Sequence, residues 1–431
     1  MDGASWATAW SELARINWTV VKPGDIIYID GGSEGMTYTT TLTIEKSGSA
    51  NAPITLRRSA EAGHAGPITI FGGRSTPLPF CGQNTYVYQT ADVRKDGIHV
   101  GNNSWIVIDG GDWRGMVIYG HNRDGVAIGA GSSNVTLRNM EIYDNGNATL
   151  VVDPNNAYYN TWYPDQQGIT LSGGTNNSFE RLIIHDNGQD SFQGGGISNL
   201  AIRESWLYNS REHPSNPALA WNYCRHSDGI QIFSGGLQSG VLIENSILGP
   251  GLLQGTILGQ SPSHGNFAEV DNVTIRNCLM IAAANSNIMG YPAVKSKKWT
   301  MDHLTVYSVR YAPDGGHHTS IFLEGMGHSL ANSIVCGAQI YMPDGDVSTS
   351  GNFQFHTNGY AIGADADPQF ANAPDWERNP SLRSLLSSDF TAKNPVMAGK
   401  GSSITTVGQL LSRQQSTPAL VDHPADTEAK K

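Results

Sequence analysis

The chain is poor in charged residues and has no long hydrophobic run. Only 15% of its 431 residues are charged, which is far fewer than a long helical protein carries. No apolar run approaches the roughly 18–20 residues that cross a bilayer, so no membrane span is expected. The net charge of -11 gives no general attraction for nucleic acid or for an anionic membrane. A polyanionic ligand would therefore need local basic groups.

Cysteine is also scarce, and the usual short catalytic motifs are missing. The four cysteines, Cys81, Cys224, Cys278 and Cys336, are scattered without the spacing of a metal site. They could form two disulfides, but four free thiols in a core are the favoured interpretation. No phosphate-binding loop, nucleophile elbow or zinc motif occurs, so no metal or cofactor is expected, and no motif supports calcium. The start at Met1 shows no signal peptide, as in a cytoplasmic protein or a trimmed secreted one.

Glycine is abundant, and short strand-like segments recur from about residue 103 onward. The chain has 50 glycines, which suits many strands joined by tight turns. Equivalent apolar positions fall at 108, 137, 179, 202, 243, 275, 301 and 330. The intervals between them are 29, 42, 23, 41, 32, 26 and 29 residues. A basic repeat of this length with variable insertions predicts a solenoid in which each repeat forms one coil.

Each repeat follows one order of strands. The first strand is followed two residues later by an asparagine at 139, 245, 277 and 332, and then by a second apolar strand. Asparagine tolerates left-handed backbone geometry and can hydrogen-bond to its copy one coil away, so these residues are interpreted as a ladder. A third strand closes each coil, as at 168–171 and 229–232. Long insertions precede many of these third strands and are expected to wall a groove over one sheet.

The sequence predicts a single all-β domain between two caps. Residues 1–24 are expected to form a helical N-terminal cap, because apolar positions between Ser5 and Val20 have helical spacing. A parallel β-helix with three strands per coil is predicted over 25–345. An irregular C-terminal cap is predicted over 346–405, followed by a disordered polar tail over 406–431.

The repeats, the opening run from Ser5 to Ile29 and the run from Asp367 to Phe370 together resemble right-handed parallel β-helix proteins of the pectin-lyase-like superfamily. The resemblance covers about residues 4–401. It implies the fold, but it selects no single family, because the superfamily includes lyases, hydrolases, epimerases and non-enzymatic surface proteins. The function must therefore be argued from the site.

Two acidic residues occupy the same place in successive repeats. Asp190 and Asp228 each precede a third strand, so their Cα atoms are expected about 4.8 Å apart. Two such carboxylates could act as acid and base, with a separation that depends on the reaction. The run from Ser227 to Ile230 is similar to the Asn-Thr-Asp-Gly run of polygalacturonase-type hydrolases, although their other motifs are missing. The alternative interpretation is that both aspartates cap turns.

Further polar and aromatic residues are predicted around this pair. The candidate catalytic residues beside Asp190 and Asp228 are His226, His213, Arg211 and Arg225. The candidate substrate-binding residues are Gln193, Gln231, Tyr158, Trp162, Tyr163, Trp221 and Tyr223. A group of histidine, arginine and carboxylate could neutralise a uronate and remove its C5 proton, and flat rings stack on sugars. Alternatively, the polar groups pin the insertion and the rings pack the loops against the coil. His185 and Asp186 are interpreted as turn residues.

The predicted function is to bind and cleave an extracellular polysaccharide, by β-elimination or by acid/base hydrolysis. The expected partner is a polysaccharide or oligosaccharide, outside the cell or on its surface. The alternative is a non-catalytic surface, adhesive or filament-forming protein. The sequence carries no expectation about the oligomeric state.

Overall fold

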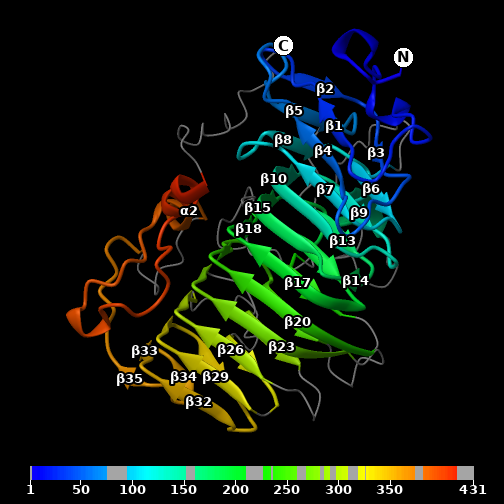
Figure 1. The fold of residues 1–431 in the computed structure, drawn as a ribbon. Coiled ribbons are helices and arrows are strands. Elements are labelled where there is room, and N and C mark those ends of the chain that lie inside the picture. The colour runs from blue at the N-terminus through cyan, green and yellow to red at the C-terminus, as the bar shows by residue number, and fades with distance from the viewer. Residues whose placement is uncertain are drawn as a thin grey trace.

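In a computed structural model, the chain winds into an elongated coil of parallel strands (Figure 1). The structure describes residues 2–74, 95–151, 161–209, 227–233, 236–259, 268–281, 286–291, 298–308, 319–325, 327–373 and 382–414. Each complete coil has three strand segments, and each segment pairs in parallel with its equivalents in the coils before and after it. Among the described residues, no helix is both long and apolar enough to cross a bilayer.

Two of the three segments belong to one large bent sheet. Its first arm consists of β1 (Ile26–Ile29), β4 (Ile54–Arg58), β7 (Ile106–Asp109), β10 (Val135–Tyr143), β14 (Gly174–Thr175), β15 (Ser178–His185), β17 (Ile197–Arg203), β20 (Gly236–Glu244), β23 (Ala268–Arg276), β26 (Trp299–Asp302), β29 (His328–Ala331) and β32 (Val347–Ser350). Its second arm consists of β2 (Met36–Tyr38), β5 (Ile68–Phe71), β8 (Met116–Tyr119), the ends of β10 and β15, β18 (Trp206–Tyr208), β21 (Ile247–Leu248), β24 (Leu279–Ile281), β27 (Thr305–Tyr307), β30 (Ile334–Cys336), β33 (Phe353–Phe355) and β35 (Ala364–Asp365).

The third segment forms a separate sheet, called the closing sheet below. It consists of β3 (Leu42–Thr43), β6 (Ile98–Gly101), β9 (Val126–Ile128), β13 (Ile169–Leu171), β16 (Phe192–Gly194), β19 (Ile230–Ile232), β22 (Gln254–Gly259), β25 (Ser286–Tyr291), β28 (Thr319–Leu323), β31 (Gln339–Tyr341) and β34 (Asn358–Gly359). A hairpin of β11 (Asn147–Val151) and β12 (Thr161–Asp165) lies between the second arm and the closing sheet in the chain order.

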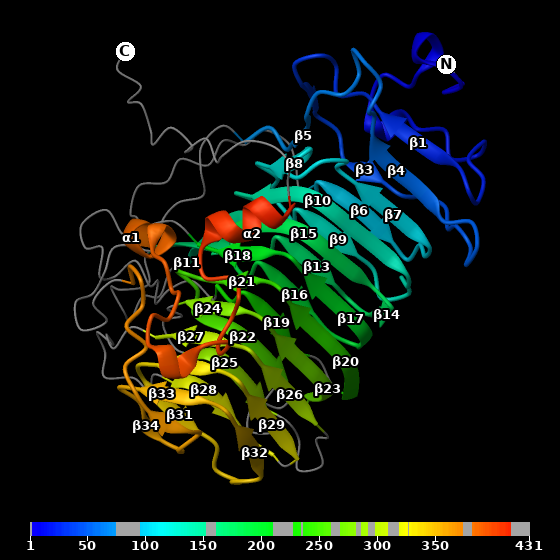
Figure 2. The same cartoon turned by 60° about the vertical axis from the view of Figure 1, so that its left-hand side comes forward.

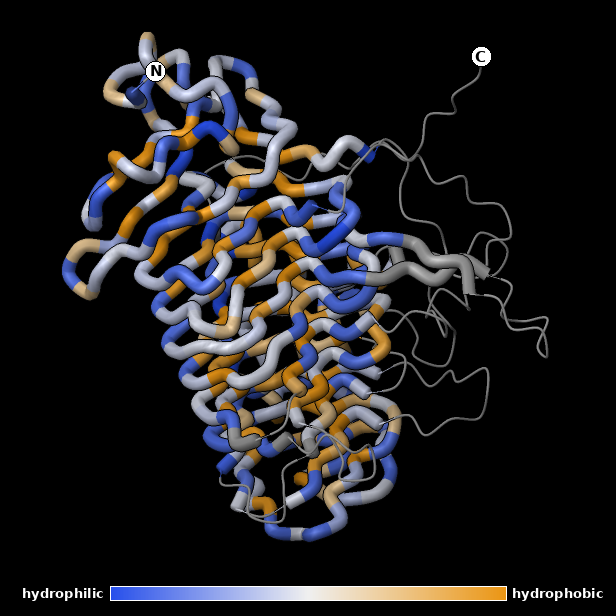
Figure 3. Tube along the Cα trace, turned by 90° about the vertical axis from the view of Figure 1, so that its right-hand side faces the viewer, coloured by the Kyte–Doolittle hydropathy of each residue, from blue (hydrophilic) through white to orange (hydrophobic). Residues whose placement is uncertain are grey.

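The register of the first arm confirms the predicted repeat. The eight apolar positions from 108 to 330 pair in sequence, from Ile108 with Leu137 to Met301 with Leu330. Their side chains point into the coil and are buried. Figure 3 shows hydrophobic positions recurring from coil to coil along the molecule. Insertions change the interval in the sequence without changing this register, because each coil contacts only its neighbours.

The bend between the two arms depends on single left-handed residues. Asn139, Asn245, Asn277 and Asn332 all have φ between 50° and 62°, which asparagine tolerates better than most residues. Asn277 donates to the Asn245 side chain at 2.7 Å, as the ladder interpretation requires. Other coils place Arg181, Glu204 or His303 at this position with the same geometry. The tight pairing of neighbouring coils therefore imposes the bend even where the sequence lacks asparagine.

The N-terminal cap differs from the predicted helix. The structure has two short 3₁₀ turns, Trp6–Thr8 and Leu13–Arg15, and no α-helix in this segment. Trp6 stacks on His64 with ring centroids 4.1 Å apart, and its indole N–H donates to Glu61 at 2.7 Å. Side-chain contacts with the first coil thus fix this segment, and helical backbone hydrogen bonds do not. An isolated helix of this length is only marginally stable.

The C-terminal part also differs from the expected boundaries. Strands β32 to β35 continue the coil beyond residue 345. The chain then turns back alongside the second arm, with α1 (Leu382–Ser387), a 3₁₀ turn (Pro395–Met397) and α2 (Val407–Gln414), as Figures 1 and 2 show. Residues 407–414 are therefore helical where a disordered tail was expected. Their apolar side chains, such as the buried Leu410, pack against the coil, and a hydropathy pattern over so short a segment gives little signal.

Candidate functional site

The outer face of the closing sheet carries one side chain per coil in a straight row. Successive strands place His99, Ala127, Thr170, Gln193 and Gln231 side by side. Neighbouring members are about 4.8 Å apart because the strands are hydrogen-bonded in register. The row is predominantly polar, and Gln193 donates through its amide to Gln231 Oε1 at 3.0 Å.

Asp190 and Asp228 lie in successive coils, as predicted, and both are fully buried. The backbone N–H of Asp228 donates to Asp190 Oδ1 at 2.8 Å. In the next coil, the backbone N–H of Gln254 donates in the same way to Asp228 Oδ1 at 3.0 Å. Each carboxylate thus caps the turn of the following coil, which is the geometry of the turn-capping interpretation.

The second oxygen of each carboxylate accepts from the amide three residues later. Gln193 donates to Asp190 Oδ2 at 3.2 Å, and Gln231 donates to Asp228 Oδ2 at 3.3 Å. These bonds fix the two amides of the outer row. Gln193 is half-buried and Gln231 is buried. Asp190 and Asp228 therefore position the two predicted sugar-binding glutamines, and their own catalytic role stays a prediction.

Most of the other predicted site residues lie outside the described part of the chain. These are His226, His213, Arg211, Arg225, Tyr158, Trp221 and Tyr223. Trp162 and Tyr163 belong to β12, where the structure describes the backbone but not the side chains. Their roles stay predictions.

Farther along the closing sheet the outer row becomes apolar. Ile257, Met289, Phe322 and Tyr341 continue it toward the C-terminal end. Phe322 and Tyr341 stack with ring centroids 5.1 Å apart, and Tyr341 is exposed. A ring pair with one exposed and one partly buried member is a suitable platform for a sugar face. The row thus carries a histidine at its N-terminal end, a hydroxyl and two amides in its middle and flat rings at its C-terminal end.

A second polar group lies on the outer face of the second arm. His185 Nδ1 lies 2.8 Å from Asp186 Oδ2, and His185 Nε2 lies 3.4 Å from Glu141 Oε1. Glu141 also pairs with Arg114 at 2.6 Å. The His185 ring continues a stack that includes Tyr119, Tyr143 and Tyr208, with neighbouring ring centroids 4.7–5.0 Å apart.

The charge state of His185 follows from these partners. Burial disfavours the imidazolium, but the two carboxylates outweigh burial and raise the pKa of His185 to about 9. Asp186 has φ 52° and occupies the turn, as expected, whereas His185 is the last residue of β15 and not a turn residue. The sequence reasoning missed Arg114 and Glu141 because they stand in different coils. Only the register places them beside His185.

A third group lies at the N-terminal end of the closing sheet's row. His99 Nδ1 lies 3.0 Å from Asp96 Oδ2, and Arg123 Nε lies 3.6 Å from Asp96 Oδ1. The sequence reasoning missed this group as well. The signal was present: Asp96 and His99 have the same three-residue spacing as Asp190 with Gln193 and Asp228 with Gln231.

The structure also has a half-open cavity of about 960 Å³ at the N-terminal end of the coil, away from these groups. It is lined by aliphatic, aromatic and acidic side chains, among them Ile27, Trp6, Trp10, Glu12 and Asp30. Among the described residues, no group of three or more histidine, cysteine or acidic side chains is arranged to hold a metal ion.

Comparisons with known proteins agree with this architecture. Residues 84–256 match the family model described as a right handed beta helix region. The solved structure of pectate lyase Pel9A is similar, with a TM-score of 0.54 and 16% identity over 94% of this chain and 84% of that one. A rhamnogalacturonan lyase is similar with a TM-score of 0.50 and 12% identity over 94% and 93%. No curated protein sequence matches this chain.

The chain is a right-handed parallel β-helix. The predicted fold is therefore confirmed. At these identities the likeness extends to the fold alone, so the function rests on the site.

Proposed function

We propose that this protein binds an extracellular acidic polysaccharide along the outer face of the closing sheet and cleaves it by β-elimination. The observation that carries the proposal is the continuous row of outward side chains on that face. Its polar part runs through Thr170, Gln193 and Gln231, and its aromatic end is formed by Phe322 and Tyr341. A coil spacing of about 4.8 Å is close to the length of one sugar residue, so a glycan lying along the row would meet one side chain per sugar.

Elimination is favoured over hydrolysis because of how Asp190 and Asp228 are bonded. A hydrolase needs two carboxyl groups that face the glycosidic bond, one of them as an acid. Here both carboxylates are fully buried and each accepts a backbone N–H and a side-chain amide. Both oxygens of each carboxylate are therefore engaged within the turns, whereas the acid of a hydrolase must reach the leaving-group oxygen. Elimination needs instead a base and a cation near the uronate carboxylate.

Exposed basic side chains occur at one end of the row. Arg123 is 54% exposed, and Lys95 is exposed beside it in the preceding coil's turn. They supply the local positive charge that a chain with a net charge of -11 needs in order to attract a polyanion. Similar solved structures are lyases by their titles, which agrees with this proposal.

The test is to incubate the protein with a panel of polysaccharides, both acidic and neutral. Two readouts are needed: ultraviolet absorbance of an unsaturated uronate, and the appearance of reducing ends. Elimination produces both signals on an acidic glycan, whereas hydrolysis raises reducing ends alone. Binding is measured in parallel by electrophoresis in gels that contain the glycan. Binding without product would identify a non-catalytic protein. If the protein shows no binding and forms no product, the whole proposal is contradicted.

A further inference from the structure

One pattern is repeated along the closing sheet. In several coils, a buried residue at the turn is paired with the outward side chain three residues later. The pairs are Asp96 with His99, Gln167 with Thr170, Asp190 with Gln193 and Asp228 with Gln231, with contacts of 3.0 to 3.3 Å. Only the first of these four pairs has an ionisable outward side chain. His99 therefore occupies the place that an amide or a hydroxyl occupies in the other coils.

Asp96 differs from the other turn aspartates in what its carboxylate bonds. Asp124, Asp190 and Asp228 each accept the backbone N–H of the following coil at 2.8–3.0 Å. Within the described part of the chain, Asp96 accepts no such bond, and its buried Oδ1 has no hydrogen-bond partner. Its hydrogen-bonding contact is with the His99 ring, through Oδ2. Asp96 thus orients His99 through Oδ2, as Asp190 and Asp228 orient Gln193 and Gln231, and differs from them in the surroundings of Oδ1.

This contact determines which nitrogen of His99 can accept a proton. An aspartate beside Nδ1 favours the tautomer with its proton on Nδ1, so the lone pair lies on Nε2. The His99 side chain is 46% exposed, whereas that of Asp96 is 7% exposed. The dyad thus combines a buried acceptor with an imidazole that a ligand can reach.

The charged surroundings come from both neighbouring coils. On one side, Arg123 lies 3.6 Å from Asp96. The buried Asp124 follows it, and its pKa is raised to about 6, mainly by burial and further by Asp96. On the other side, Thr43 pairs with His99, and the exposed Glu45 follows two residues later. A guanidinium and an imidazole therefore lie at one end of the same outer row.

We propose that His99, oriented by Asp96, is the acid/base residue of the site, with Arg123 binding the substrate carboxylate. This inference rests on the proposed function. His99 Nε2 takes the proton from C5 of a uronate, and the electron pair of that C–H bond forms the C4–C5 double bond. The C4–O bond to the leaving sugar breaks, and the leaving oxygen takes a proton from the imidazolium or from water. No oxidant or reductant is needed.

The decisive variant is His99→Gln, because glutamine is the side chain that Gln193 and Gln231 supply at this place in other coils. It keeps a hydrogen-bonding group but cannot transfer the proton. We expect kcat to fall by roughly 100-fold or more, the usual contribution of general acid/base catalysis, while KM and glycan binding stay within about twofold. The matched control is His303→Gln. His303 is 41% exposed and lies 2.8 Å from Asp302 in the same kind of pair, but at the bend between the two arms.

Asp96→Asn tests the positioning role. The amide no longer favours the same tautomer, so kcat should fall by about 10–100-fold with KM unchanged. A merely structural role of Asp96 would not lower kcat while leaving KM unchanged. Added imidazole should also restore part of the activity of His99→Ala, and it should have no effect on the wild type.

The possible outcomes separate the two proposals. A cleaving wild type together with an active His99→Gln variant would overturn the role of His99 and leave the proposed function standing. A wild type that binds a glycan but releases no product would overturn both the acid/base role and the cleavage. Equal losses in His99→Gln and His303→Gln would indicate a general effect on the fold and would also overturn the inference.

Discussion

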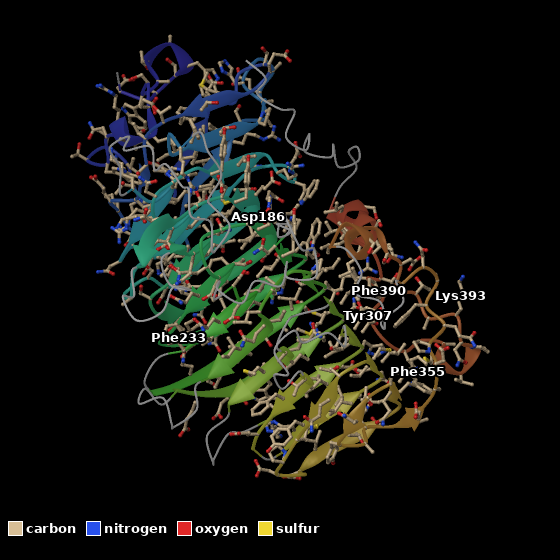
Figure 4. All side chains as sticks on the ribbon, turned by 180° about the vertical axis from the view of Figure 1, so that it is seen from behind. Asp186, Phe233, Tyr307, Phe355, Phe390 and Lys393 are labelled. Atoms are coloured by element: carbon tan, nitrogen blue, oxygen red, sulfur yellow. The ribbon has the colours of Figure 1, made fainter. Side chains whose placement is uncertain are left out.

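The outer faces of the closing sheet and of the second arm have the same backbone geometry but different side chains. On the second arm, Ile247, Leu279 and Ile334 point outward and are buried, because the C-terminal segment packs over them with residues such as Leu385 and Phe390. Figure 4 shows Tyr307 and Phe390 together between the coil and this segment. On the closing sheet, the corresponding positions hold His99, Thr170 and Gln193. The inward side chains form the core that stabilises the coil, and the outward side chains determine what each face can bind.

The C-terminal segment is also anchored by specific polar contacts. Ser403 N donates to Asn277 Oδ1 at 2.7 Å, and Ser402 N donates to Thr305 Oγ1 at 2.9 Å. Lys400 donates to the Asn332 side chain at 2.7 Å. Asparagines at the bend thus hydrogen-bond to each other in the ladder and also accept hydrogen bonds from the C-terminal segment. The covered face is part of the core, and we expect its substitutions to affect stability more than those of the closing sheet.

The largest effect on stability is expected from Phe390→Ala. Phe390 is 1% exposed and packs on Tyr307 with ring centroids 5.0 Å apart. Removing its ring should lower the free energy of unfolding by about 3–5 kcal/mol, as a large cavity in a packed core does. Chemical denaturation would measure this loss. Val396→Ala, at a position 60% exposed in the same segment, is the control and should change stability by less than about 0.5 kcal/mol.

The buried histidine of the second arm should make stability depend on pH. The pKa of His185 is raised to about 9 from its ordinary value of 6.5, so its stabilising contribution is complete below about pH 6.5. It is lost as the pH rises through 9, and the loss is about 3 kcal/mol. Unfolding free energies at pH 6 and 9.5 would show this slope in the wild type and in His303→Gln. If His185→Gln shows the same change in unfolding free energy between pH 6 and 9.5, His185 is not its cause.

The turn aspartates should have an intermediate effect. Asp228→Ala removes the acceptor of the Gln254 N–H and of the Gln231 amide. Leaving buried donors unpaired should lower the free energy of unfolding by about 1–3 kcal/mol. Asp96→Ala removes no backbone acceptor of this kind and should cost less. A larger loss for Asp96→Ala than for Asp228→Ala would show that the two aspartates do not differ as the hydrogen bonds indicate.

The smallest effect on stability, and a clear one on binding, is expected from Gln193→Ala. Gln193 is half-buried on the outer row, so its loss should change stability by less than about 1 kcal/mol. Glycan binding should weaken by roughly 5- to 10-fold, about the worth of one hydrogen bond. Thr300→Ala, at an exposed position of the first arm, is the control and should leave binding unchanged in the same electrophoretic assay. Unchanged binding in Gln193→Ala would argue against the closing sheet as the binding face.

The sequence by itself determined the coil, because apolar positions recur at the spacing of a solenoid and each repeat has the same order of three strands. From Ile108 to Leu330 the predicted equivalences are the observed pairs. It also placed Asp190 and Asp228 in adjacent coils. The sequence could not predict the hydrogen bonds of these two carboxylates, because an aspartate that caps a turn and a catalytic aspartate have the same local sequence.

Only the tertiary structure decided which outward groups meet. Glu141 and His185 are 44 residues apart in the chain and approach within 3.4 Å only because the strands are in register. The return of residues 382–414 along the second arm depends on an apolar surface that exists only once the coil has formed. Asp96 shares its spacing with the other turn aspartates, and only the structure shows that, among the described residues, it lacks the backbone hydrogen bond that they accept. Local patterns fix local geometry, whereas contacts between coils depend on every residue that sets the register.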